Sequence, residues 1–251
     1  MSVYWRALRA EMLKLKHTLA LWMVLILPLA VAALIVLVGS LHPSAPQRST
    51  TPAAAWHGLE TGMFSLWCLL MVPLFVTLET ALLAGLEHGN QQWKHLLALP
   101  LPPSAHYLAK LLMMVLMVLG AYLLLCVLVL PAGWILMVTA PDHGLAGLPP
   151  LADLWPLPAA SFAASMLIVA LQTWIALRWQ SFTLAVSVGI VATVVGFIVA
   201  QSRFGNFFPW TLPGRIFHHG GDMQLTLAVG LGGGVLVAVL GLVDFLRRES
   251  P

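Results

Sequence analysis

Charged residues are scarce in this 251-residue chain: Asp, Glu, Lys and Arg together make up 8% of it, whereas 60% of its residues are hydrophobic. An average soluble domain has about 25% charged residues. One soluble core could not bury so many apolar side chains, so the composition excludes a soluble protein. We therefore predict an all-α membrane protein.

Cysteine is almost absent as well. The two cysteines, Cys68 and Cys126, both lie in apolar segments. In such surroundings a cysteine is usually a small core residue. We therefore interpret neither of them as part of a disulfide or of a metal site.

The common catalytic and nucleotide-binding motifs are also missing. The chain has no G-x-x-x-x-G-K-[ST], H-E-x-x-H, G-x-S-x-G, C-x-x-C or G-x-G-x-x-G. Without a P-loop it does not hydrolyse ATP by that mechanism. We expect that this chain is not an enzyme and that it binds no metal and no cofactor. The energy for its function therefore has to come from another protein.

What the chain does have is six long apolar runs, each able to cross a bilayer as a helix, since about 20 residues suffice. We interpret residues 1–251 as a single transmembrane domain. The predicted spans cover about 18–39, 62–86, 107–139, 156–177, 181–201 and 223–246. The segments 41–56, 140–158 and 202–222 are predicted to be external loops. Pro28 predicts a kink in span one, and Pro131 predicts a tilt or break in span three.

An amphipathic helix is predicted ahead of the first span, over residues 2–17. Trp5, Leu8, Met12 and Leu15 share one helical stripe. The basic residues Arg6, Arg9, Lys14 and Lys16 lie elsewhere around the helix. This pattern is typical of a helix in the membrane interface. A secretory signal is the alternative, but the apolar run that follows is longer than its usual core.

The basic residues also predict the orientation. Nine lie on one side of the predicted spans and three, namely Arg48, Arg203 and Arg215, lie on the other. By the positive-inside rule the nine mark the cytoplasm, so both termini are expected there. The membrane surface accounts for the net charge of +3, and we expect no nucleic acid as a partner.

One polar stretch, Glu87 to Lys110, separates spans two and three. Gly89 and Asn90 can begin a short helix that the following prolines end. Trp93, Leu96 and Leu97 would share one face of it, at i, i+3 and i+4. The apolar face could lie on the membrane while Gln91, Lys94 and His95 point to water or to a partner. The alternative is an ordinary cytoplasmic connection.

The order of residues in this stretch resembles the first cytoplasmic loop of type-2 ABC transporter permeases, in particular the lantibiotic-immunity and bacitracin-resistance branch. The resemblance rests on EHGNQQWK at 87–94, LLALP at 96–100 and YLAK at 107–110. Further similar patterns are QTW at 172–174, RWQS at 178–181 and the Pro-Trp-x-x-Pro stretch at 209–213.

The resemblance implies a function and a set of partners. The loop would be the coupling helix that sits in a cleft of an ATPase subunit, through Glu87, Asn90, Trp93, Lys94, Leu96, Leu97 and Pro100. That subunit would carry ATP and Mg, and a second copy or a paralogue of the permease would complete the exporter. The implied cargo is an amphipathic peptide antibiotic or a lipid-like compound. The implied place is the bacterial cytoplasmic membrane.

Several residues within the predicted spans and external loops allow two interpretations. Glu79 either lines a translocation path or snorkels and hydrogen-bonds near Thr77 and Thr80. Phe208 and Trp210 form either an external gate or an interfacial aromatic belt.

Histidines and glycines give the remaining candidates. His218, His219 and Asp222 are the best external cluster for a metal, although adjacent histidines are poor joint ligands. The alternative function is accordingly a metal-handling protein or enzyme that uses Glu79 and the loop histidines; a structural anchor or sensor is a third. Gly230, Gly234 and Ala238 predict a face of small residues for close packing in span six.

Overall fold

The computed structural model describes residues 3–16, 18–41, 51–88, 102–179, 181–217 and 222–249, and over these residues it contains helices and no strands. Six of its helical segments are long and apolar enough to cross a membrane. The predicted all-α membrane fold is therefore confirmed. Within the described part, each predicted span corresponds to one of the six segments.

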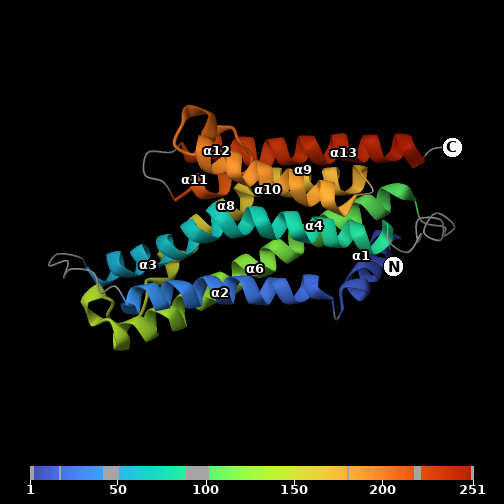
Figure 1. Cartoon of the computed structure of the whole chain (residues 1–251). Helices are drawn as coiled ribbons and strands as arrows, with labels where there is room; N and C mark the ends of the chain where they lie inside the picture. Colours follow the sequence, from blue (N-terminus) through green and yellow to red (C-terminus); the bar gives the residue numbers. More distant parts are fainter. Residues whose placement is uncertain are drawn as a thin grey trace.

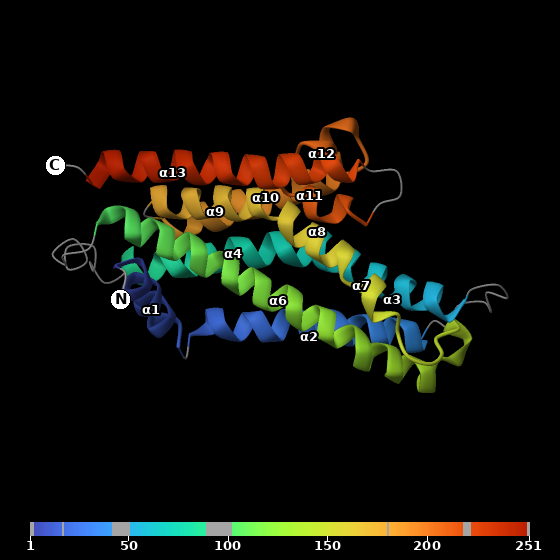
Figure 2. The same ribbon diagram turned by 180° about the vertical axis from the view of Figure 1, so that it is seen from behind.

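The first half of the chain supplies a short helix and three spans. Helix α1 (Val3–Leu15) precedes span one, which is α2 (Leu19–Leu41). Span two consists of α3 (Pro52–Leu66), the π-helical turn η1 (Trp67–Met71) and α4 (Val72–His88). Span three is the single helix α6 (Pro103–Thr139), which runs obliquely across the bundle in Figures 1 and 2.

The second half supplies the other three spans. Span four comprises α7 (Leu151–Leu154), α8 (Pro156–Ala164) and α9 (Met166–Arg178), and span five is α10 (Phe182–Val199). Span six comprises α12 (Met223–Leu227), the π-helical turn η4 (Ala228–Gly232) and α13 (Gly233–Glu249). Three shorter pieces, η2 (Pro141–His143), η3 (Arg203–Asn206) and α11 (Leu212–Arg215), lie between spans.

The segments predicted as external loops are more helical than expected. Helix α3 begins at Pro52, because Thr51 caps it by accepting a hydrogen bond from the Ala54 amide at 3.4 Å. Residues 52–56 thus belong to span two and not to a loop. In the same way α7 and α8 take residues from the predicted loop 140–158. These helix starts were not predicted because both segments are rich in proline, which is typical of loops. Proline is, however, also favoured in the first turn of a helix.

Prolines inside the spans do not break them. Helix α6 continues through Pro131, so the predicted tilt is seen but the break is not, and α2 continues through Pro28. In span two the π-turn lies just before Pro73, and the Val72 amide bonds to the Trp67 carbonyl. The wider turn makes room for a residue that has no amide and crowds the preceding turn.

The two ends of the bundle can be told apart by their chain connections. Figures 1 and 2 show α1 and the C-terminal end of α13 at the end where α4 stops at His88 and α6 starts at Pro103. We call this the loop end and the opposite one the far end. Both termini thus lie at the same end, as an even number of spans requires.

Spans two, three and four form the interior. Large side chains such as Trp56, Phe64, Trp67 and Phe75 are fully buried there. By contrast, spans one, five and six are much less buried, and exposed apolar side chains are found along α2, α10 and α13 and also on the outer side of α6. In a membrane protein such surfaces face lipid or another protein chain.

Span six, at η4 and the start of α13, approaches the junction of α8 and α9 closely enough to require glycine. A Cβ added at Gly230 would lie 2.6 Å from Ala164 Cα, and one at Gly234 would lie 2.9 Å from the Met166 carbonyl carbon. Both distances are too short for a side chain. The predicted small-residue face therefore packs within this chain.

Candidate functional site

The predicted coupling helix lies outside the described residues, which include none of Asn90, Trp93, Lys94, Leu96, Leu97 and Pro100. Glu87 belongs to the last turn of α4, but only its backbone is described. What the structure supplies is the frame of this loop: the end of α4, the start of α6 and the helices packed on them.

Helix α1 is part of this frame. Its buried residues are Ala7, Leu8, Glu11 and Leu15, while Trp5 and Met12 are about half exposed. The side of α1 that packs on protein is therefore turned by part of a turn from the predicted apolar stripe of Trp5, Leu8, Met12 and Leu15, and the interfacial role of the helix stays a prediction. Two contacts of α1 with α6 explain the rotation: a cluster of three alanines and an ion pair.

The ion pair joins Glu11 to Lys110. The Lys110 Nζ donates to Glu11 Oε2 at 3.2 Å, and both side chains are only 4% exposed. Lys14 donates to the other carboxylate oxygen at 2.8 Å. Breaking a buried pair by removing one partner is strongly destabilising. This ion pair therefore holds α1 against α6, about two turns after the start of α6. The sequence analysis did not single out Glu11, although an acidic residue three positions before Lys14 was a visible signal.

A second polar contact fastens the hairpin of α9 and α10 to α13. The Arg178 guanidinium donates to both Asp244 oxygens at 2.6 and 2.7 Å, and the Trp174 indole donates to Oδ2 at 3.1 Å. This contact also lies at the loop end. Asp244 was missed because it stands one turn before the basic end of the chain, where an acidic residue looks like part of a solvated terminus.

Glu79 lies in the interior of the bundle, with no exposed surface. Neither carboxylate oxygen has a hydrogen-bond partner among the described residues. Thr80 donates to the Val76 and Thr77 carbonyls instead, and the Thr77 hydroxyl has no partner there either. The predicted alternative of snorkelling or bonding to these threonines is thus not seen. A carboxylate without partners is costly in hydrocarbon.

The predicted gate residues belong to a segment that folds back onto the bundle. Trp210 is 7% exposed, its ring centroid is 5.7 Å from that of Phe208, and the Trp210 Cβ and the Phe208 ring lie next to Gly196 of α10. Helix α11 follows, with Leu212, Pro213 and Gly214 buried. Trp210 therefore packs against protein. Phe204 and Phe207 are exposed and suit an interfacial belt.

A network of neutral groups holds this returning segment in place. The Ser161 hydroxyl donates to the Pro213 carbonyl at 2.8 Å. The Tyr122 hydroxyl and the Cys68 thiol lie 3.1 and 3.0 Å from the same Ser161 oxygen. The network joins η1, α6, α8 and α11. Cys68 is thus the buried core residue that its apolar surroundings predicted.

The metal hypothesis gains no support from the described part of the chain, which contains no group of three or more His, Cys, Asp and Glu that could hold an ion. His218 and His219 lie outside the described residues. Asp222 caps α12 by accepting from the Leu225 amide at 3.1 Å. Its carboxylate therefore has a structural role.

A family model matches most of the chain. The model of the family described as "ABC-2 family transporter protein" matches residues 7–198. No curated protein matches the chain. The matched range extends from α1 to α10, and it includes Glu79, Lys110, Arg178 and the loop between α4 and α6.

Proposed function

The chain belongs to the ABC-2 family of transporter proteins and is a membrane permease subunit, and from this premise we propose that it forms an exporter with a separate ATPase. Its own sequence contains no P-loop. The observation that carries the proposal is the family match over residues 7–198, because it covers the predicted coupling loop and five of the six spans.

The proposed complex contains the ATPase subunit, which supplies ATP and Mg, and a second permease copy or paralogue. The proposed coupling surface is the loop between α4 and α6, with Glu87, Asn90, Trp93, Lys94, Leu96, Leu97 and Pro100. The positive-inside asymmetry supports a cytoplasmic loop end, with both termini on that side of a bacterial inner membrane. An ATPase could then reach the loop.

In the proposed mechanism, closure of the ATPase dimer pushes on the loop and moves the helices on either side of it as rigid bodies. The buried Glu11–Lys110 pair makes α1 move with α6, since separating the two charges is costly. The Arg178–Asp244 contact joins α9 to α13 in the same way. Force applied at the loop end would thus reach several spans together.

The proposed cargo is an amphipathic peptide antibiotic or a lipid-like compound, and its export would protect the cell against that compound. Support comes from the resemblance of the loop to the lantibiotic-immunity and bacitracin-resistance branch. Glu79 is a candidate for a polar residue on the translocation path of the cargo, because it is buried and has no hydrogen-bond partner among the described residues. Phe208 and Trp210 suit an external gate, because they lie on a returning segment held by neutral hydrogen bonds.

Co-purification with the cognate ATPase tests the coupling surface. We expect Trp93→Ala to leave membrane insertion intact and to lower partner binding more than tenfold, since losing a buried aromatic anchor costs about 2 kcal/mol or more. Lys94→Ala is the control, because a charge at the rim of an interface contributes much less. Full partner binding by Trp93→Ala would reject the coupling surface.

A further inference from the structure

A second buried glutamate, Glu60, lies in α3 toward the far end of the bundle. Its side chain is 1% exposed, and its Oε2 lies 3.4 Å from His57 Nδ1. Its other oxygen, Oε1, has no hydrogen-bond partner among the described residues. Half of this carboxylate is therefore unsatisfied, which is costly unless something else binds it.

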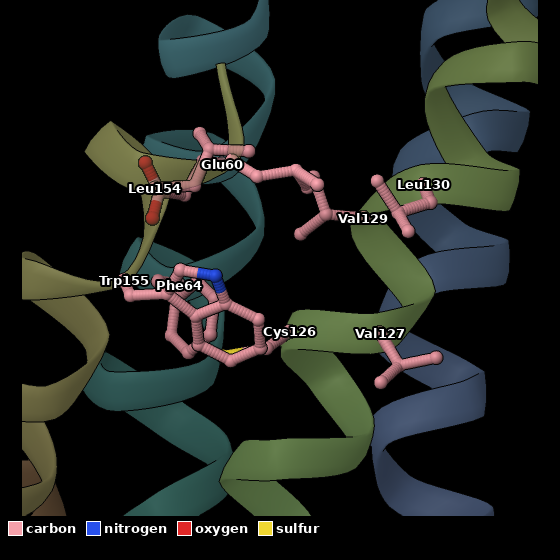
Figure 3. Close-up of a pocket in the computed structure, with 9 residues that line it drawn as sticks. Glu60, Phe64, Cys126, Val127, Val129, Leu130, Leu154 and Trp155 are labelled. Atoms are coloured by element: carbon pink, nitrogen blue, oxygen red, sulfur yellow. The ribbon is translucent and has the colours of Figure 1, made fainter. Parts of the chain in front are cut away.

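Glu60 lines a cavity of about 50 Å³ between α3, α6 and the start of span four. Figure 3 shows Glu60 and Phe64 on one wall, residues of α6 on another, and Leu154 and Trp155 on a third. The full lining is Glu60, Phe64, Cys126, Val127, Val129, Leu130, Leu151, Leu154 and Trp155. Among the described residues that line the cavity, Glu60 is the only acidic or basic one.

The cavity has a rim that a ligand can reach. Leu151 and Trp155 line it and are 52% and 46% exposed, whereas Phe64 and Glu60 are fully or almost fully buried. The carboxylate thus lies at the inner side of an apolar and aromatic entrance. A ligand would bring its polar group in first and leave its apolar part against Leu151 and Trp155.

The size of the cavity and the carboxylate of Glu60 indicate which kind of ligand could bind. The cavity exceeds the space that one water needs, and it is too small for a bulky head group. A primary ammonium is compact, carries the opposite charge and donates up to three hydrogen bonds. The rings of Phe64 and Trp155 add a surface that attracts cations. A neutral alcohol could fill the same space without satisfying the charge.

We propose that Glu60 and this cavity form a binding site for the primary ammonium group of an amphipathic amine. The amine donates to Glu60 Oε1, and its alkyl chain lies along Leu130, Leu151 and Leu154. The site stands independently of the ATPase and of export, so its failure would leave the proposed function untouched. A bound water is the rival occupant.

The test measures binding of hexylamine and hexanol to the full chain in nanodiscs of phosphatidylcholine, with empty nanodiscs as the background. We expect saturable binding of about one hexylamine per chain, and binding of hexanol that is no stronger than its partition into lipid. Equal binding of both compounds, or no hexylamine binding above the empty nanodiscs, would overturn the proposal. This comparison needs no variant, so it does not depend on how a variant folds.

Two variants then locate the site. Glu60→Gln keeps the shape but removes the charge, and we expect hexylamine affinity to fall at least about tenfold, the usual loss for a charge-assisted hydrogen bond. Asp153→Asn removes the same charge from an exposed position on α7, next to the cavity rim but outside its lining. We expect no change from it. Loss in both variants, or in neither, would contradict a site at Glu60.

Cys126 gives a local readout, because it lines the same cavity. In a Cys68→Ser background it is the single cysteine of the chain. We expect hexylamine to slow its modification by methyl methanethiosulfonate, a small neutral reagent, and Glu60→Gln to remove this protection. Saturable hexylamine binding without any effect on the Cys126 rate would place the amine elsewhere and reject the proposal.

Discussion

The loop end and the far half of the bundle hold their helices together by different polar chemistry. At the loop end, charges meet opposite charges, as in Glu11 with Lys110 and Arg178 with Asp244. In the far half, Cys68, Tyr122 and Ser161 form a neutral network. Glu60 there has one oxygen without a partner in the described chain. Ion pairs between helices suit the end that receives force, whereas neutral bonds suit the half that binds and releases. A buried carboxylate oxygen without a partner among the described residues occurs in both halves, at Glu79 on α4 and at Glu60 on α3.

The largest effect should come from the buried ion pair at the loop end. Lys110→Met leaves the buried Glu11 carboxylate with Lys14 alone, and we expect a loss of about 3 kcal/mol in stability, as for other broken buried pairs. Thermal unfolding in detergent measures it. The control is the Glu11→Gln, Lys110→Met double variant, which should recover much of the loss. A single variant as stable as the wild type would show that α1 is not fastened to α6 by charge.

An intermediate effect should come from the glycine contact of α13 with the α8–α9 junction. Gly234→Leu would drive a side chain into the Met166 backbone, and overpacking of this kind costs about 1–3 kcal/mol. Val235→Leu is the matched control, since Val235 is 65% exposed. Folded yield after purification compares them. Equal, mild effects would mean that close packing does not join span six to span four.

The smallest effect should come from the neutral network of the far half. Ser161→Ala removes the hydroxyl that donates to the Pro213 carbonyl and contacts Tyr122 and Cys68. This should cost about 1–2 kcal/mol, because the net value of a neutral hydrogen bond is small. Thermal unfolding in the same detergent gives the value. A loss as large as that of Lys110→Met would erase the difference between the two halves.

The six spans could be predicted from the sequence because apolar length decides membrane crossing. The ends of the helices could not. Glu60 stands between the predicted loop 41–56 and the predicted start of span two at about 62, so its burial was not foreseen. Its cavity depends on residues of α6 and span four that only tertiary packing brings together.

The face of a helix was also harder to predict than the helix itself. Periodicity placed Trp5 and Met12 with Leu8 and Leu15, since all four are apolar. The structure buries Ala7 and Glu11 instead, because small residues allow α1 to approach α6 and because Lys110 is there to pair with the glutamate. Neither partner on α6 can be recognised from the sequence of α1 alone.

The most direct test of the central claim is ATP-driven transport by this chain and its ATPase reconstituted in liposomes. We expect the wild type to export an amphipathic cargo and to hydrolyse ATP faster when cargo is present. The Leu96→Asp, Leu97→Asp double variant should insert normally but lose both activities, because it places charges on the predicted apolar coupling face. Full transport and full cargo stimulation by this variant would contradict the coupling of a separate ATPase through the loop between α4 and α6.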